Sequence, residues 1–213
     1  MLNWIEQRPP RNTFDWTIRQ LQLQPYQHIL EVGYGSGRLL AEVARTIKIG
    51  FLAGIDSSIP LYRQACRRNK AFIRQDLMQL HIGQLYELPY PAHYFHTIYS
   101  CGIHRSWNNV VTESLRLAAL LRIGGRLVLL SPPRPDRNEE DIRMEAARLQ
   151  AAYLAAGLTD IHTEYREFSS GTGVAVTGFK PDMYVDPEVF TPVNNCLLNP
   201  EAYFISNVAR MPI

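Results

Sequence analysis

Short apolar runs alternate with longer amphipathic segments along most of the chain. The short runs read as buried β-strands, whereas the longer segments repeat apolar positions every three to four residues, as a helix does. The predicted strands cover residues 28–32, 51–55, 78–82, 94–100, 126–130, 161–168 and 174–179. The predicted helices cover residues 13–22, 37–47, 60–69, 109–121 and 139–156. This alternation is typical of βα units around a parallel sheet.

The connections between these segments predict how the sheet is built. Helices link the first five strands, and one more helix leads to the sixth. The last two strands have no room for a helix between them and should therefore form an antiparallel hairpin. We predict an α/β fold with a seven-stranded, doubly wound sheet that is mostly parallel and has an antiparallel hairpin at strand seven. Gly124 and Gly125 are expected to end the helix over residues 109–121 with a left-handed cap.

The composition is that of an ordinary folded domain. The 213 residues are 46% hydrophobic and 20% charged, and 22 Lys and Arg against 20 Asp and Glu leave a net charge of +2. This balance gives no electrostatic reason to bind nucleic acid or a membrane. The first twenty residues lack an apolar secretion signal, and Cys66, Cys101 and Cys196 form no CxxC pair. We therefore expect a cytoplasmic protein without a metal site.

The strongest chemical signal is a glycine-rich turn after the first predicted strand. Three glycines follow one another there at a spacing of two, directly before a helix: Gly33, Gly35 and Gly37. Glycine lets the backbone wrap closely around a ligand, and the free N–H groups of the next helix favour an anion. The dinucleotide pattern GxGxxG fails in both registers, because Arg38 and Leu40 stand where a third glycine belongs. We therefore expect a ligand other than NAD.

The spacing ExGxGxG of this turn resembles motif I of the class I S-adenosylmethionine-dependent methyltransferases. Three later features resemble the same family: Asp56 after the second strand, Gly83–Pro91 with Phe95 around the third and fourth, and Leu120–Leu127 before the fifth. The resemblance covers residues 21–181 and is closest to the small-molecule branch that includes the ubiquinone and menaquinone biosynthesis methyltransferases. It implies a Rossmann-like fold, S-adenosylmethionine as the cofactor and a small-molecule methyl acceptor.

The resemblance also implies a domain organisation. Residues 1–181 would form the methyltransferase domain, with residues 1–27 as an N-terminal helical cap segment, and residues 182–213 would be a C-terminal extension. The extension is rich in Pro and aromatic residues and shows no clear periodicity. We expect its aromatic side chains to pack on the domain's own surface, with a lid or a homodimer contact as the alternatives.

The family's cofactor contacts carry over to ten positions of this sequence. The turn and Glu31 would hold the methionine moiety, and Asp56 would accept hydrogen bonds from both ribose hydroxyls. The other contacts are to adenine. The predicted cofactor-binding residues are Glu31, Gly33, Tyr34, Gly35, Gly37, Asp56, Ser57, Ile59, Gln84 and Leu85. Two positions depart from the family pattern, because Gln84 and His96 each stand where the family usually has Asp.

His104 is the candidate catalytic residue. It follows the fourth strand, and ligands of open α/β sheets bind at the carboxyl ends of the strands. Alignment of the acceptor with the sulfonium methyl supplies most of the acceleration, but a hydroxyl, ammonium or acidic carbon must also lose a proton. We expect His104 to act as the base or to contact the substrate, with Tyr34, Arg105 and Trp107 lining the acceptor pocket. The alternative is a histidine beside a helix that is bonded to backbone.

Three other functions are compatible with the sequence. A methyltransferase fold can bind a cofactor or a partner without transferring methyl groups, and Gln84, His96 and the extension fit such a non-catalytic module. An RNA methyltransferase would use a basic cluster that otherwise reads as a solvated helix face, consisting of Arg63, Arg67, Arg68, Lys70 and Arg74. A hydride-transferring dehydrogenase would need the missing third glycine. Ser131-Pro132-Pro133-Arg134 follows the fifth strand and reads as a strand terminator.

Overall fold

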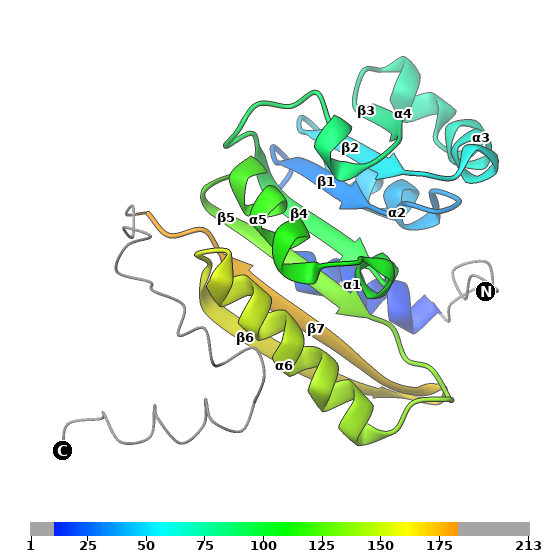
Figure 1. Ribbon diagram of the computed structural model, residues 1–213. Helices are drawn as coiled ribbons and strands as arrows, with labels where there is room; N and C mark the ends of the chain where they lie inside the picture. The colour runs from blue at the N-terminus through cyan, green and yellow to red at the C-terminus, as the bar shows by residue number, and fades with distance from the viewer. Residues whose placement is uncertain (1–10, 183–213) are drawn as a thin grey trace. The chain divides into compact units, whose positions relative to one another are not determined.

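The computed structural model describes residues 11–182, which form a sheet with helices on both faces (Figure 1). The strands are β1 (His28–Val32), β2 (Phe51–Asp56), β3 (Met78–Ile82), β4 (Phe95–Cys101), β5 (Leu121–Ser131), β6 (Thr159–Phe168) and β7 (Gly171–Phe179). The helices are α1 (Arg11–Leu21), α2 (Arg38–Thr46), α3 (Ile59–Arg68), α4 (Lys70–Arg74), α5 (Val110–Leu120) and α6 (Glu139–Ala155), with short 3-10 helices η2 (Leu85–Glu87) and η3 (Ile103–Ser106).

The strand order in the sheet is β3-β2-β1-β4-β5-β7-β6. From β1 the chain moves outward to β3 and then returns to β4 on the other side of β1. Every pair from β3 to β5 is parallel, whereas β7 is antiparallel to both β5 and β6. The prediction of a doubly wound, mostly parallel, seven-stranded sheet with an antiparallel hairpin at strand seven is confirmed.

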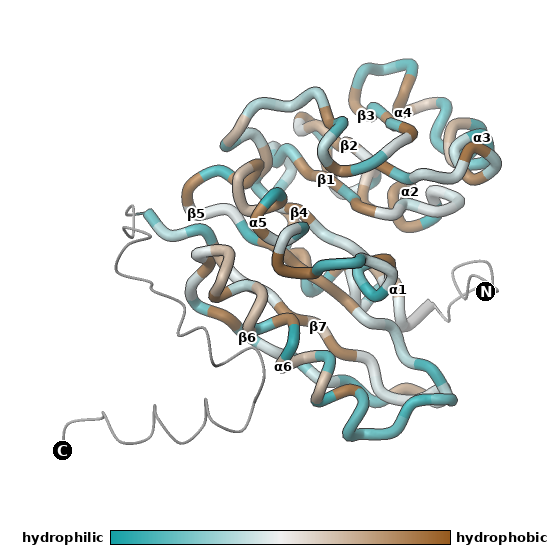
Figure 2. Tube along the Cα trace, in the orientation of Figure 1, coloured by the Kyte–Doolittle hydropathy of each residue, from teal (hydrophilic) through white to brown (hydrophobic). Residues whose placement is uncertain are grey.

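Alternate residues of the central strands enter two different cores. Ile29 of β1 lies in one core with Trp16 of α1 and Leu40 of α2, whereas its neighbour Leu30 lies in the other core with Leu117 of α5 and Leu149 of α6. Parallel strands covered on both faces read as continuous apolar runs, which is the pattern seen in the sequence. Figure 2 shows hydrophobic residues recurring along the central strands and a hydrophilic stretch on the segment that enters α6.

The boundary between α5 and β5 differs from the prediction. The helix ends at Leu120, and Gly124 and Gly125 lie inside β5 rather than in a helix cap. Gly124 has a φ of 70°, and the pairing of β5 with β4 shifts register beside the two glycines. The two glycines therefore allow an irregularity within a long strand. A pair of glycines is equally compatible with a helix cap, so the local sequence does not distinguish the two structures.

Two predictions involve residues outside the described range. Residues 1–10 belong to the predicted cap segment, and residues 183–213 make up nearly all of the predicted extension. The domain boundaries at residues 1–181 and 182–213, the lid and the homodimer contact therefore stay predictions. Within residues 11–182, none of the helices combines the length and the apolar character that crossing a membrane requires.

Candidate active site

The winding of the sheet reverses between β1 and β4, and the loops after these two strands meet at its carboxyl edge. A Cβ atom on Gly33, in the loop after β1, would lie 2.6 Å from Cβ of Ile103 in η3, which follows β4. Open α/β sheets bind their ligands at such a switch point. Most of the predicted site residues come from the loops at this edge.

The glycine turn packs too closely against its surroundings to carry side chains at two positions. Gly33 has a φ of 76° and touches η3, while Gly37 has a φ of 70°. A Cβ on Gly37 would lie 2.6 Å from Nδ2 of Asn69 and 2.8 Å from Cβ of Ala65. The positive φ and the close packing together require glycine at both positions. The turn is thereby held in one conformation between η3 and α3.

Asp56 joins this turn to the end of β2. Its Oδ2 accepts a hydrogen bond from the Gly35 N–H at 2.9 Å, and its Oδ1 accepts one from the Ser58 N–H at 2.9 Å. The cap of α3 is a different residue, Ser58, whose hydroxyl accepts from the Leu61 N–H. Each oxygen of a carboxylate has two lone pairs, so both oxygens of Asp56 keep one for a ligand.

The loop after β3 lies beside Asp56. The Gly83 N–H donates to the Asp56 carbonyl at 3.1 Å. The Gln84 N–H donates to the Glu87 side chain at 2.6 Å, and Gln84 itself is exposed. Leu85 packs instead against the core below α5 and α6. Ser57 and Ile59, on the other side of Asp56, are exposed.

Glu31 lies beneath this edge and is almost completely buried. Its Oε2 accepts a hydrogen bond from the Tyr99 hydroxyl at 2.8 Å. Burial raises the pKa of the Glu31 carboxyl to about 8; the Tyr99 hydrogen bond opposes this shift and the charge of Asp56 adds to it. The carboxyl is therefore mostly protonated at pH 7, and a cation bound nearby would favour its ionised form.

The side chain of Tyr34 points away from the site. Its hydroxyl donates to the His81 carbonyl at 2.9 Å, and its ring packs against Gly54. Only 2% of the residue is exposed. The prediction that Tyr34 lines the acceptor pocket is wrong, because its ring fills the core beside β2 and β3. Its backbone carbonyl accepts from the Gly37 N–H and so belongs to the turn.

His104 lies in η3 against residues of β5 and α6. Its Nε2 is 3.0 Å from Ser131 Oγ and 3.1 Å from Glu145 Oε1, and the Ser131 hydroxyl donates to the same carboxylate oxygen at 2.7 Å. The alternative of a histidine bonded to backbone is wrong, since its partners are side chains. Trp107 lies edge-on to the imidazole with ring centroids 6.1 Å apart.

Two arginines complete this cluster. Arg137 donates to Oε2 of Glu145, and Nε of Arg105 lies 3.6 Å from Oε1. Burial raises the pKa of Glu145, but its contacts with His104, Ser131 and Arg137 outweigh this effect and hold the pKa well below the ordinary value. Burial lowers the pKa of His104, although Glu145 opposes this shift. Near pH 7 the pair is therefore a carboxylate and a neutral imidazole.

No local sequence pattern points to Glu145, Ser131 or Arg137. Glu145 is one of several acidic residues along an amphipathic helix, and Ser131 belongs to the segment interpreted as a strand terminator. These residues meet His104 only because β5 lies beside β4 and α6 covers that part of the sheet.

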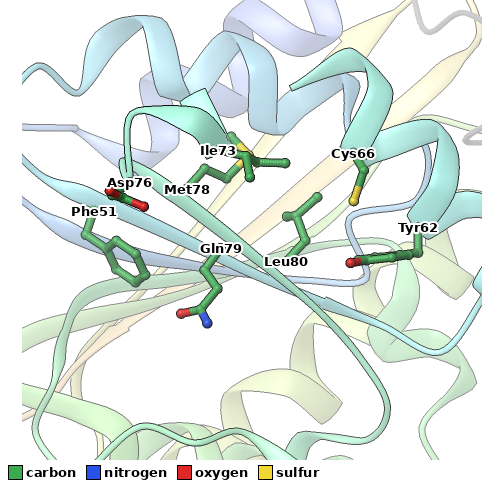
Figure 3. A pocket seen from close by; sticks show the side chains of 8 residues that line it. All are labelled: Phe51, Tyr62, Cys66, Ile73, Asp76, Met78, Gln79 and Leu80. Carbon is green, nitrogen blue, oxygen red and sulfur yellow. The ribbon is translucent and has the colours of Figure 1, made fainter. Parts of the chain in front are cut away.

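A separate hollow of about 450 Å³ lies along the edge strand β3 and the helices α3 and α4 (Figure 3). Its lining residues are Phe51, Tyr62, Cys66, Ile73, Asp76, Met78, Gln79 and Leu80. None of the predicted site residues lines it, so it is distinct from the site at the carboxyl edge. Within the described part of the chain, no three His, Cys, Asp or Glu side chains lie together in a way that could hold a metal ion.

Comparisons with known proteins agree on one family. Residues 29–125 match the family model described as "Methyltransferase domain". An uncharacterized methyltransferase of Bacillus subtilis (strain 168), YdaC, is 28% identical over 167 residues, which are 78% of this chain and 90% of that protein. A demethylmenaquinone methyltransferase of Symbiobacterium thermophilum is 30% identical over 124 residues, which are 55% of this chain and 47% of that protein.

Solved structures show the same fold at low sequence identity. A geranyl diphosphate methyltransferase in complex with S-adenosylmethionine superposes with a TM-score of 0.63 at 11% identity, and the match covers 79% of this chain and 84% of that one. The family model and the two relatives together support the class I S-adenosylmethionine-dependent methyltransferases as the family of this chain, and the solved structure shows the same fold. The resemblance predicted from the glycine turn is confirmed at the level of the family.

Proposed function

We propose that the protein transfers the methyl group of S-adenosylmethionine to a small-molecule acceptor at the carboxyl edge of β1, β2 and β4. The observation that carries this proposal is the position of Asp56. Its carboxylate is bonded to the glycine turn through Gly35 and keeps a lone pair on each oxygen. A diol held by both oxygens would therefore lie directly beside the turn.

The residues around Asp56 fit the other parts of this methyl donor. The turn and Glu31 hold the methionine moiety, with the carbonyl of Gly33 near its ammonium. Gln84 and the backbone of Leu85 meet the edge of adenine, and the exposed side chains of Ser57 and Ile59 flank the ring. S-adenosylmethionine supplies a methyl group already activated by the sulfonium, so the protein has mainly to align the acceptor.

The acceptor side of the site is the region around His104. Arg105 and Trp107 lie next to it, and the imidazole takes up the proton that a protic acceptor must lose. A small-molecule acceptor is supported by the names of similar proteins, a demethylmenaquinone methyltransferase and a geranyl diphosphate methyltransferase.

Calorimetry with S-adenosylmethionine, followed by an acceptor screen that detects S-adenosylhomocysteine, tests this proposal. We expect binding at one site per chain and release of S-adenosylhomocysteine with one class of small molecule. A protein that binds the donor but never turns over is a non-catalytic module instead, and turnover with RNA alone would identify an RNA methyltransferase. Absence of binding would contradict the proposal.

A further inference from the structure

The arrangement of His104, Ser131 and Glu145 determines which nitrogen of the imidazole carries a proton. Glu145 is ionised and can only accept hydrogen bonds, and Ser131 already donates its hydroxyl hydrogen to Glu145. Nε2 of His104 faces both of these oxygens, at 3.0 and 3.1 Å. Nε2 must therefore be the protonated nitrogen of the neutral ring, and Nδ1 must carry the free lone pair.

Nδ1 is buried and has no hydrogen-bond partner among the described residues. A buried acceptor without a partner costs about 1 to 3 kcal/mol, so such an atom in a folded protein is normally matched by a donor from a water or a ligand. The side chain of His104 is only 2% exposed, and its two side-chain hydrogen-bond partners, Ser131 and Glu145, both face Nε2. The ring thus presents one reactive nitrogen with a fixed orientation.

We propose that Glu145 is a positioning residue that holds His104 with Nδ1 as the proton acceptor for a methyl acceptor that carries a hydrogen on its reacting atom. This inference rests on the proposed function and narrows its substrate class to hydroxyls, ammonium groups and acidic carbons. The proton of the acceptor moves to Nδ1 and leaves its electron pair on the reacting atom, which uses an electron pair to form the bond to the methyl carbon, while the electron pair of the broken C–S bond stays on sulfur.

The charges around the ring favour this role. Glu145, from α6, faces Nε2 and stabilises the imidazolium that forms when Nδ1 takes a proton. Arg105 and Arg137 oppose that charge, but both are paired with Glu145 itself. Trp107 contacts the ring without adding a charge. The carboxylate is therefore the group that makes the buried imidazole basic enough to act.

Nitrogen-15 NMR of the full-length protein tests the inference without any ligand. In the wild-type protein at neutral pH, we expect His104 to be neutral, protonated on Nε2 and unprotonated on Nδ1, with its signals assigned by comparison with His104→Gln. In Glu145→Gln, we expect the pKa of His104 to fall and the population of the Nε2-protonated tautomer to decrease relative to the Nδ1-protonated tautomer. Glu139→Gln changes the same charge on the exposed side of the same helix and should alter neither property.

Finding Nδ1 protonated in the wild-type protein, or the same His104 pKa in wild type and Glu145→Gln, would overturn the inference. If Glu145→Gln does not fold, the wild-type tautomer still decides, and Ser131→Ala, which keeps the carboxylate, should retain the Nε2-protonated form. Calorimetry with S-adenosylmethionine is an independent test. If the protein does not bind S-adenosylmethionine, the proposed function is wrong. If it binds but His104 is protonated on Nδ1, only the role of Glu145 is wrong.

The acceptor found by the screen provides a kinetic test. We expect Glu145→Gln to lower kcat more than it raises KM for the acceptor, and to move the acidic limb of the kcat profile to lower pH. His104→Ala should lower kcat by roughly 10² to 10⁴-fold. Unchanged pH limbs in Glu145→Gln would count against the positioning role, because a purely structural defect would lower the rate without moving them.

Discussion

Single polar residues at the carboxyl edge make structural hydrogen bonds, and some also keep acceptor capacity for a ligand. Asp56 ties the glycine turn to β2 through two backbone N–H groups and keeps lone pairs for a ligand. His96, which departs from the family pattern, shows the purely structural case, because its Nδ1 accepts from the His28 backbone N–H at 3.1 Å. His96 therefore contributes to the packing of β1 against β4 and does not belong to the candidate site.

Replacement of Asp56 by Asn separates the two properties of its carboxylate. The amide keeps one acceptor oxygen but places an NH₂ group against an N–H donor or against the ligand. We expect affinity for S-adenosylmethionine to fall by about 1.5 to 3 kcal/mol, which is roughly 10- to 150-fold. Calorimetry measures this affinity, with Asp15→Asn, at an exposed position of α1, as the control. Unchanged affinity would refute the ribose assignment.

At the scale of elements, the turn between β1 and α2 is held by a helix from the next βα unit. Asn69, at the junction of α3 and α4, is fully buried, and its Nδ2 donates to the carbonyls of Gly37 and Ala65, each at 3.0 Å. The predicted single helix over residues 60–69 thus ends at a residue that binds the glycine turn. The position of the turn depends on α3 as well as on its own glycines.

Asn69→Ala should weaken both the fold and the site. Two buried carbonyls lose a hydrogen-bond donor, so we expect the free energy of unfolding to fall by about 2 to 3 kcal/mol, as measured by urea denaturation, and affinity for S-adenosylmethionine to fall with it. Asn109→Ala is the matched control, because it removes the cap of α5, whose side-chain oxygen accepts from the Val111 and Thr112 N–H groups. That variant should lose about 1 kcal/mol and keep its affinity. Equal affinities in both variants would show that α3 does not position the turn.

At the scale of the whole molecule, an ionisable side chain, that of Glu31, is buried in the core beneath the carboxyl edge of the sheet. Glu31 sits in β1, the central strand around which the sheet is wound, with Tyr99 of β4 as its partner. Its carboxyl keeps a proton in the folded protein up to about pH 8, whereas the ordinary value is 4.5. The pKa of Glu31 therefore links the stability of the fold to pH.

Glu31→Gln isolates this effect. The unfolded chain releases the Glu31 proton near pH 4.5 and the folded protein keeps it to about pH 8, so raising the pH between these values favours unfolding of the wild type. The stability of Glu31→Gln relative to wild type should rise by about 1.4 kcal/mol per pH unit across that range and then level off.

Chemical denaturation at several pH values measures this difference. Glu140→Gln, at an exposed position of α6, is the control and should show no such trend. A Glu31→Gln stability difference that does not change with pH would mean that Glu31 is already ionised in the folded protein.

Much of the fold could be predicted from the sequence, because strands covered on both faces and helices with one apolar face produce distinct periodic patterns. The seven strands, the hairpin at strand seven and the glycine turn are all local signals. The exceptions have local causes too: a pair of glycines is compatible with a helix cap or with an irregular strand, and only the pairing of β5 with β4 decided that Gly124 and Gly125 lie in the strand.

The sequence by itself determined the resemblance to the methyltransferases, the turn and the acidic residue after β2, since each depends on residues close together in the chain. Only the tertiary structure decided which side chains meet. Tyr34 turned into the core because Gly54 leaves room for its ring, and Glu145 met His104 because α6 covers β5 beside β4. His104 and Glu145 are 41 positions apart, and their contact depends on how a helix packs across the sheet. The hydrophobic periodicity along the chain does not determine that packing.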